Sequence, residues 1–146
     1  MDRCLLNLPY MRRLLRTASK KASWWDLLWA DPFMKLVRRT KEQYRDDFRG
    51  LYDSYYGRGL PLSYLLKQGY VFCLRTLIFE HMDFSTAGRT TSCLAFLAFV
   101  IDDWCDREEF SFDYILDSVA VPIWQVSRYR EIVSGGPHDN QTLERQ

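Results

Sequence analysis

Three aspartates spaced as DDxxD are the residues of this sequence whose types and spacing first suggest chemistry: Asp102, Asp103 and Asp106. On a helix, Asp102 and Asp106 lie one turn apart and face the same way. Two such carboxylates could hold a Mg²⁺ ion that binds a diphosphate, which is the chemistry of a prenyl-diphosphate enzyme. Such enzymes are longer and carry a second metal-binding motif, which this sequence lacks. We therefore favour a simpler interpretation, a charged helix end that faces solvent.

The other reactive residue types are too scattered to form a catalytic or metal site. The two histidines, His81 and His138, have no partner at ligand spacing, so we predict no metal. The sequence contains no G-x-S-x-G, no HExxH and no phosphate loop. None of the four cysteines forms a CxxC pair, which favours reduced thiols in an intracellular protein. We expect no catalytic residues and no cofactor, and hence no enzyme.

A glycine followed by an arginine, Gly88 and Arg89, suggests binding instead. Glycine has no side chain, so another backbone can approach it closely. The arginine guanidinium can bind a carboxylate through two parallel hydrogen bonds. If that carboxylate belongs to a partner helix, the pair would serve helix-in-groove recognition. An ion pair within the chain explains these two residues equally well.

One apolar segment links the Gly-Arg pair to the aspartates. Ser85 and Thr86 can cap its start, and residues 93–101 are an unbroken apolar run. A helix that is apolar all round is buried in a protein or in a membrane, and spanning a bilayer takes about 20 apolar residues. The sequence therefore predicts a buried central helix over about residues 86–104, with the Gly-Arg pair at its exposed end, and no transmembrane helix.

Residues spaced by three and four predict amphipathic helices around this central one. The first, over residues 3–18, should bend at Pro9, because proline removes a backbone donor. Asp31 and Pro32 are a strong helix start, and the periodic stretch after them runs to Tyr55. Other boundaries follow from capping, turn and breaker residues: a cap at Ser23, a turn over 57–59, helices over 61–69 and 70–82, a cap at Ser111 and a break at Pro122.

These signals together predict the fold class. We find no strand alternation, so the fold should be all-α, with six to eight helices around the central helix. With 146 residues, the chain should form one domain. The Ser-Gly-Gly-Pro stretch at residues 134–137 should end the helical structure. The expected division is a helical domain over residues 1–133 and a flexible polar tail over residues 134–146.

The net charge of +1 hides an uneven distribution. Residues 1–50 carry 12 Lys and Arg against 6 Asp and Glu, while residues 51–146 carry 8 against 13. The basic half could contact an anionic membrane surface or nucleic acid. A solvated basic face explains it as well and is the interpretation we favour. A peripheral membrane or nucleic-acid binder thus remains a third hypothesis.

Three stretches between residues 20 and 133 resemble a known family, in the same order and with similar spacing. They are Ser23-Trp24-Trp25 with Leu27-Leu28-Trp29, Lys35-Leu36-Val37 and Lys41-Glu42-Gln43-Tyr44; Asp83-Phe84-Ser85-Thr86-Ala87-Gly88-Arg89 with Ala95-Phe96-Leu97; and Tyr114-Ile115-Leu116-Asp117 with Trp124. Through them the chain resembles the adenovirus early-region 1B small T antigen family, whose members are viral Bcl-2-like inhibitors of apoptosis. The resemblance implies a Bcl-2-like bundle.

The middle stretch also resembles the first homology region of cellular Bcl-2 proteins, where a Gly-Arg pair opens the central helix. By that resemblance, Gly88 allows a close helix approach, Arg89 binds an aspartate of the ligand's death-motif helix, and Phe96 lines the groove. We expect Leu74 and Ile78 to contribute to the same groove. The cellular proteins have Asn-Trp before the pair, whereas this chain has Thr86 and Ala87, so the groove should differ in shape there.

The implied activity is sequestration without catalysis. A host pro-apoptotic Bcl-2 family protein, of the Bax or Bak type or with a death motif only, would lay a helix in the groove, and host-cell apoptosis would be blocked. The resemblance places such a protein inside the infected cell, at host mitochondrial or nuclear-envelope membranes and in the cytoplasm. Nucleic acid is not an expected partner, and peripheral membrane association is compatible with the sequence.

Overall fold

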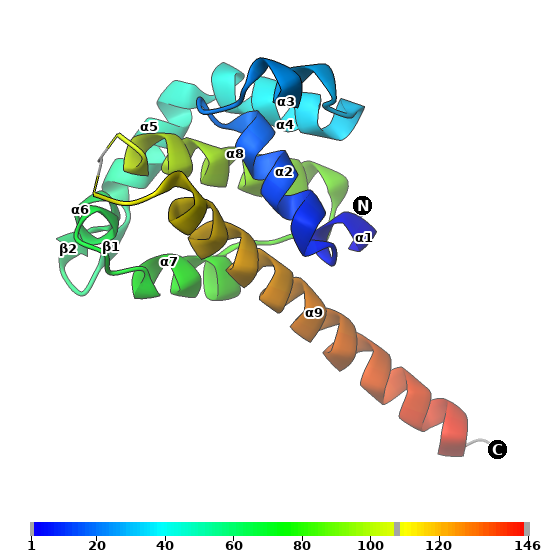
Figure 1. Ribbon diagram of the computed structural model, residues 1–146. Coiled ribbons are helices and arrows are strands. Elements are labelled where there is room, and N and C mark those ends of the chain that lie inside the picture. Colours follow the sequence, from blue (N-terminus) through cyan, green and yellow to red (C-terminus); the bar gives the residue numbers. More distant parts are fainter. Residues whose placement is uncertain (1, 107–108, 145–146) are drawn as a thin grey trace.

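Helices make up most of the computed structural model, which describes residues 2–106 and 109–144 (Figure 1). The first half contains α1 (Asp2–Leu5), α2 (Leu8–Ala18), α3 (Trp24–Leu28), α4 (Pro32–Gln43) and α5 (Arg45–Ser54). The second half contains the short strands β1 (Tyr56–Gly57) and β2 (Leu60–Pro61), then α6 (Leu62–Lys67), α7 (Phe72–Thr76), the π-helical turn η1 (Leu77–His81), α8 (Ala87–Trp104) and α9 (Phe112–Glu144). The predicted all-α fold class is confirmed.

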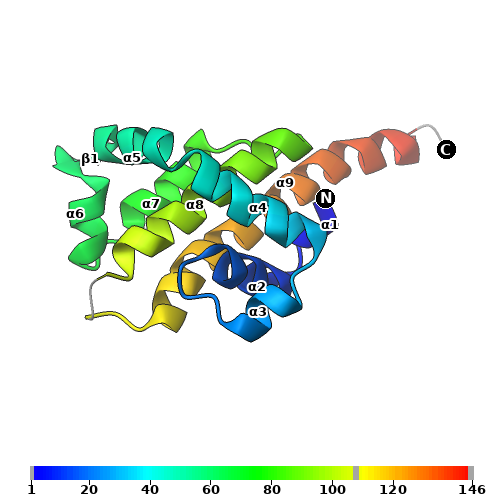
Figure 2. The same ribbon diagram turned by 90° about the horizontal axis from the view of Figure 1, so that it is seen from above.

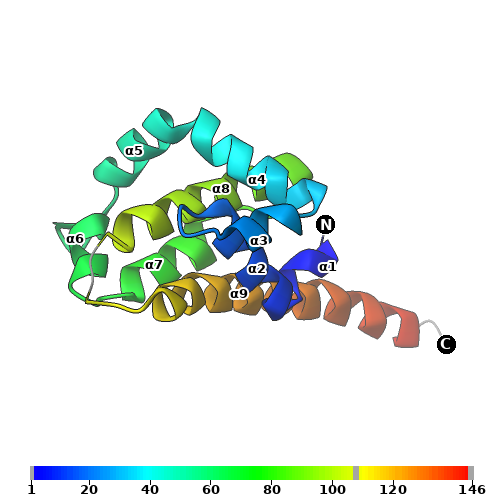
Figure 3. The same cartoon turned by 45° about the horizontal axis from the view of Figure 1, so that its top comes forward.

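Helix α8 runs through the middle of the bundle (Figure 2), and α2, α4, α5, α6 and α9 pack against it. Figure 3 shows α4 and α5 as an arch on one side of α8, with α9 on the other side. Every residue from Leu94 to Asp102 is buried, because this helix has no polar face to turn toward water. The central helix predicted over residues 86–104 is therefore confirmed.

Short polar residues begin several helices where the sequence predicts them. Thr86 accepts a hydrogen bond from the backbone N–H of Arg89 at 3.2 Å and starts α8. Asp31 accepts from the N–H of Met34 at 2.8 Å and starts α4. Ser23 and Asp26 form a reciprocal capping box at α3. Each cap satisfies an N–H group that has no partner within the helix.

Two predicted helices are divided differently from our expectation. The chain does not bend at Pro9: α1 ends at Leu5, Asn7 caps α2, and Pro9 lies in the first turn of α2, where a missing N–H costs no hydrogen bond. The long helix expected after Pro32 is interrupted at Tyr44 and becomes α4 and α5. A distortion of one residue leaves the three-and-four spacing almost unchanged, so periodicity does not reveal it.

The turn expected over residues 57–59 is a small hairpin. Tyr56 pairs with Pro61, and Gly57 pairs with Leu60. The two turn residues, Arg58 and Gly59, have φ values of 54° and 80°. Two left-handed residues in succession are what a two-residue hairpin turn requires. The strands have two residues each, which is too short to produce a recognisable alternation in the sequence.

Helix α9 is longer than predicted. It continues across Pro122 and through residues 134–137 to Glu144, and it projects away from the bundle (Figure 1). Proline removes only one hydrogen bond from the helix, and the neighbouring Val119, Ile123 and Val126 are buried, so packing holds this part in place. The division into a domain over residues 1–133 and a tail over residues 134–146 stays a prediction. No helix in the described residues is long and apolar enough to cross a membrane.

Candidate functional site

The Gly-Arg pair lies on the surface, at the first turn of α8. The Arg89 side chain is 65% exposed, and its Nη1 donates to Oδ2 of Asp83 at 2.5 Å. Asp83 comes from the loop just before the helix and is itself about half exposed. The ion pair within the chain, which the sequence left open, is therefore present. It shows that the position beside this guanidinium accommodates a carboxylate.

Asp83 is held in its ionised form by its surroundings. Hydrogen bonds from Ser85, including one from its backbone N–H at 2.8 Å, together with the Arg89 guanidinium, lower the pKa of Asp83 to about 2. Hydrogen bonds and a nearby cation both favour the charged form of a carboxyl group. The Arg89 guanidinium therefore faces a full negative charge at neutral pH.

The loop that carries Asp83 is fastened to the bundle on two sides. From α8, the Thr90 hydroxyl donates to the carbonyl oxygen of Phe84 at 3.1 Å, and the Cys93 thiol lies 3.5 Å from that of Asp83. From α9, an Nη atom of Arg130 donates to the carbonyl oxygen of Met82 at 3.1 Å, and the guanidinium lies over the Phe84 ring. The carboxylate is thus presented by a positioned loop.

Gly88 has open space where a side chain would begin. A Cβ atom built there would meet no heavy atom within 4 Å. The close approach that glycine permits is therefore not used by any described segment of this chain. An incoming backbone could approach the first turn of α8 at this point.

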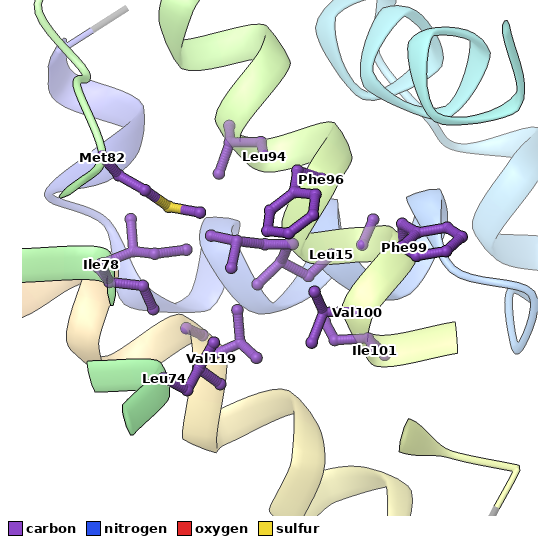
Figure 4. Close-up of a cluster of buried hydrophobic side chains, with 14 of the residues drawn as sticks. Leu15, Leu74, Ile78, Met82, Leu94, Phe96, Phe99, Val100, Ile101 and Val119 are labelled. Carbon is purple, nitrogen blue, oxygen red and sulfur yellow. The ribbon is translucent and has the colours of Figure 1, made fainter. Parts of the chain in front are cut away.

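The three apolar residues expected in the groove lie in the closed core. Leu74 and Ile78 are fully buried and Phe96 is 5% exposed, and Figure 4 shows all three among the buried side chains. Phe96 is covered by α5, since its ring centroid lies 5.7 Å from that of Phe48 and 6.3 Å from that of Tyr52. Leu74, Ile78 and Phe96 belong to one buried cluster, whereas Gly88 and Arg89 are exposed.

The DDxxD aspartates are all paired with basic side chains of this chain. Asp102 is buried and accepts from Nζ of Lys41 at 2.6 Å and from the backbone N–H of Lys20 at 2.7 Å. Asp106 forms an ion pair with the Lys20 side chain. Asp103 binds one basic group from α5 and one from α6, each at 3.2 Å: Arg49 and Lys67.

These contacts explain the motif without a ligand. In the described residues, no cluster of three or more His, Cys, Asp or Glu side chains is arranged to hold a metal ion. The aspartates instead fasten the C-terminal end of α8 to α4, α5 and α6. The expectation that this end faces solvent is correct for Asp106 and wrong for Asp102, which is 5% exposed, because Lys41 supplies a buried partner for its charge.

Sequence reasoning did not assign a role to Asp83 or to Arg130. Asp83 lies six residues before Arg89, a separation that no helix periodicity relates, and its contact depends on the loop between η1 and α8. Arg130 is 48 residues from its acceptor at Met82. Contacts of this kind form only when separate elements assemble.

Comparison with known proteins identifies a family. Residues 1–134 match the family model described as adenovirus E1B 19K protein / small t-antigen. Similar curated proteins include the E1B protein, small T-antigen, of human adenovirus E serotype 4, 36% identical with 78% of each chain covered. That of human adenovirus C serotype 2 is 34% identical, with 84% of this chain and 68% of the relative covered.

The protein of the same description from human adenovirus A serotype 12 is 30% identical over 135 residues, with 90% of this chain and 79% of the relative covered. No solved structure matches the chain. The family match over nearly the whole chain and these relatives show that the chain belongs to the adenovirus E1B 19K protein / small t-antigen family.

Proposed function

We propose that this viral protein blocks host-cell apoptosis by binding the death-motif helix of pro-apoptotic Bcl-2 family proteins, of the Bax or Bak type, beside the first turn of α8. The observation that carries the proposal is the exposed Arg89 guanidinium, already bound to a carboxylate, next to the open space at Gly88. A helix that supplies its own aspartate would match both features. The protein acts by sequestration and carries out no reaction.

Binding begins with an exchange of carboxylates. Asp83 occupies Arg89 in the unbound chain, and an aspartate of the partner would replace it or share the guanidinium with it. Because Asp83 stays ionised, it would then favour a basic side chain on the same partner helix. The charges would add specificity more than affinity.

Most of the affinity must come from apolar contacts, and the core has to open for them. Phe96 lies under α5, so the partner would reach it by displacing Phe48 and the segment around it. Leu51, also on α5, is 56% exposed and offers a first apolar contact. Truncating one well-packed anchor of the partner helix would cost about 2 kcal/mol or more.

The decisive experiment measures binding of death-motif peptides to the wild-type protein and to two variants. Arg89→Ala removes the carboxylate partner, and Gly88→Glu fills the open space and adds a repelling charge. We expect each change to weaken binding by about tenfold or more. Isothermal titration calorimetry gives the affinities, and circular dichroism confirms that both variants fold.

Matched controls make the result specific. Arg75→Ala removes another exposed arginine, and Gln68→Glu adds a negative charge at an exposed position outside α5 and α8. Both controls should bind as the wild type does. Equal affinity of the wild type and the two α8 variants would contradict the proposed site.

We place this activity inside the infected cell, at the host mitochondrial and nuclear-envelope membranes and in the cytoplasm. The support is the family membership together with the proposed partners, which act at the mitochondrial outer membrane. Fractionation of infected cells, followed by capture of Bax or Bak with the wild-type protein and with Arg89→Ala, tests the location and the partner together.

A further inference from the structure

Tryptophans gather on the outside of α3, away from the α8 site. Trp24, Trp25 and Trp29 are each more than 60% exposed, and Leu28 is more than half exposed. None of the five residues of α3 is buried. We call Trp24, Trp25, Leu28 and Trp29 the tryptophan face. Such large apolar side chains, gathered on one short segment and left mostly exposed, mark a surface that contacts a membrane or another molecule.

The tryptophan face is held in place by local contacts that do not depend on its rings. The capping box of Ser23 and Asp26 fixes the start of α3, and α3 lies against α2 (Figure 3). Between the two helices is a hollow of about 450 Å³, lined by Arg13, Thr17, Trp25, Asp26 and Trp29. The rings can therefore be changed without opening the core.

The sequence on both sides of α3 is rich in basic residues. Residues 9–41 contain nine Lys and Arg but only two acidic residues. Both acids are engaged within the chain, since Asp26 accepts from the Ser23 N–H and Asp31 accepts from the Tyr10 hydroxyl. Arg12, Arg16, Lys20 and Lys41 form ion pairs with aspartates of α8, α9 and the loop after α8. Four other basic side chains of this stretch are exposed and form no ion pair among the described residues: Arg13, Lys21, Lys35 and Arg39.

We propose that the tryptophan face inserts into the headgroup region of an anionic phospholipid bilayer. Tryptophan is favoured at membrane interfaces because its ring is apolar and its N–H is polar. The exposed side chains of Arg13, Lys21, Lys35 and Arg39 contact the lipid phosphates, and their positive charge matches a negative surface. Because both acidic residues of this stretch are already engaged, a uniformly negative lipid surface complements it better than a protein surface, which carries charges of both signs. This attachment is independent of the partner site at Arg89.

The test is flotation of the full chain with vesicles of phosphatidylserine and phosphatidylcholine, compared with vesicles of phosphatidylcholine alone. The wild type should bind the anionic vesicles, more weakly at high salt. The double variant Trp24→Ser, Trp29→Ser should lose about tenfold or more of this binding. Brominated lipids should quench the wild-type tryptophan fluorescence, and this quenching should fall sharply in the double variant.

The control removes equally exposed aromatic side chains from another part of the surface. Tyr70→Ser with Phe72→Ser, whose rings are 63% and 61% exposed, should float as the wild type does. Death-motif peptide binding should be unchanged in the Trp24, Trp29 variant. Equal flotation of wild type and that variant, flotation without quenching by brominated lipid, or binding to DNA but not to vesicles would each overturn the proposal.

Discussion

Single charged residues determine what each end of α8 does. At the C-terminal end, Asp102 is buried and paired with Lys41, so its charge is used to hold α4 in place. At the N-terminal end, Arg89 is exposed and paired with a half-exposed loop residue, Asp83. A buried pair is costly to break, whereas an exposed pair exchanges partners easily. The first therefore serves stability and the second suits binding.

Lys41→Met should destabilise the protein strongly. The variant leaves the Asp102 carboxylate buried without its cation, which typically costs about 3–5 kcal/mol of unfolding free energy. Adding Asp102→Asn should recover much of the loss, because the amide oxygen still accepts from the Lys20 N–H. Urea unfolding measures both, with Lys35→Met as the exposed control. The account of Asp102 is wrong if Lys41→Met is no more harmful than Lys35→Met.

The Asp83 carboxyl should titrate at about pH 2, well below its unfolded value of about 4. Because the folded pKa is lowered, its contribution to stability is complete above about pH 4 and is lost as the pH falls through 2. Ser85→Ala and Arg89→Ala should each raise the pKa of Asp83. NMR titration of the side-chain carboxyl gives the values, and an unchanged pKa in both variants would show that these groups do not hold the charge.

At the scale of the elements, the α5–α8 contact is where the core must open. Phe48 and Tyr52 of α5 cover Phe96 of α8. At its C-terminal end, α5 meets η1, where the rings of Tyr55 and His81 lie 6.2 Å apart. Helix α5 therefore closes the apolar part of the proposed groove.

Hydrogen–deuterium exchange should show this movement. On addition of a death-motif peptide, amides of α5 (residues 45–54) should exchange faster, because the helix gives up its contacts with α8. Amides at the C-terminal end of α8 should keep their protection, because Lys41 of α4 and Lys67 of α6 still hold Asp102 and Asp103 when α5 moves. Slower exchange throughout α5, or no change, would argue that the peptide binds without displacing it.

The same elements show how far sequence reasoning reaches. The central helix, its cap at Thr86 and the start of α4 at Asp31 follow from local patterns, because helix ends are fixed by neighbouring residues. The interruption at Tyr44 and the Lys41–Asp102 pair do not, since each depends on how separate helices pack. For the candidate site, the exposed Arg89 was expected, but its partner Asp83 and the burial of Phe96 required coordinates.

At the scale of the whole molecule, the C-terminal end of α8 is held by ion pairs, and its N-terminal end is accessible to solvent. Acidic residues at a helix C-terminus oppose the helix dipole, and here basic side chains from four surrounding segments offset them. The accessible end presents one guanidinium beside open space. In the proposed binding mode, a partner would bind at the accessible end while the ion pairs from α4 and α6 hold the other end.

The most direct test of this account is a double-mutant cycle across the proposed contact. Arg89→Gln in the protein is combined with Asp→Asn at the conserved acid of a death-motif peptide, and calorimetry gives the four affinities. If the guanidinium binds that carboxylate, the two changes should be non-additive, with a coupling energy of about 1 kcal/mol or more. Strictly additive losses, or no loss from either change, would contradict the claim that Arg89 receives the partner's acid.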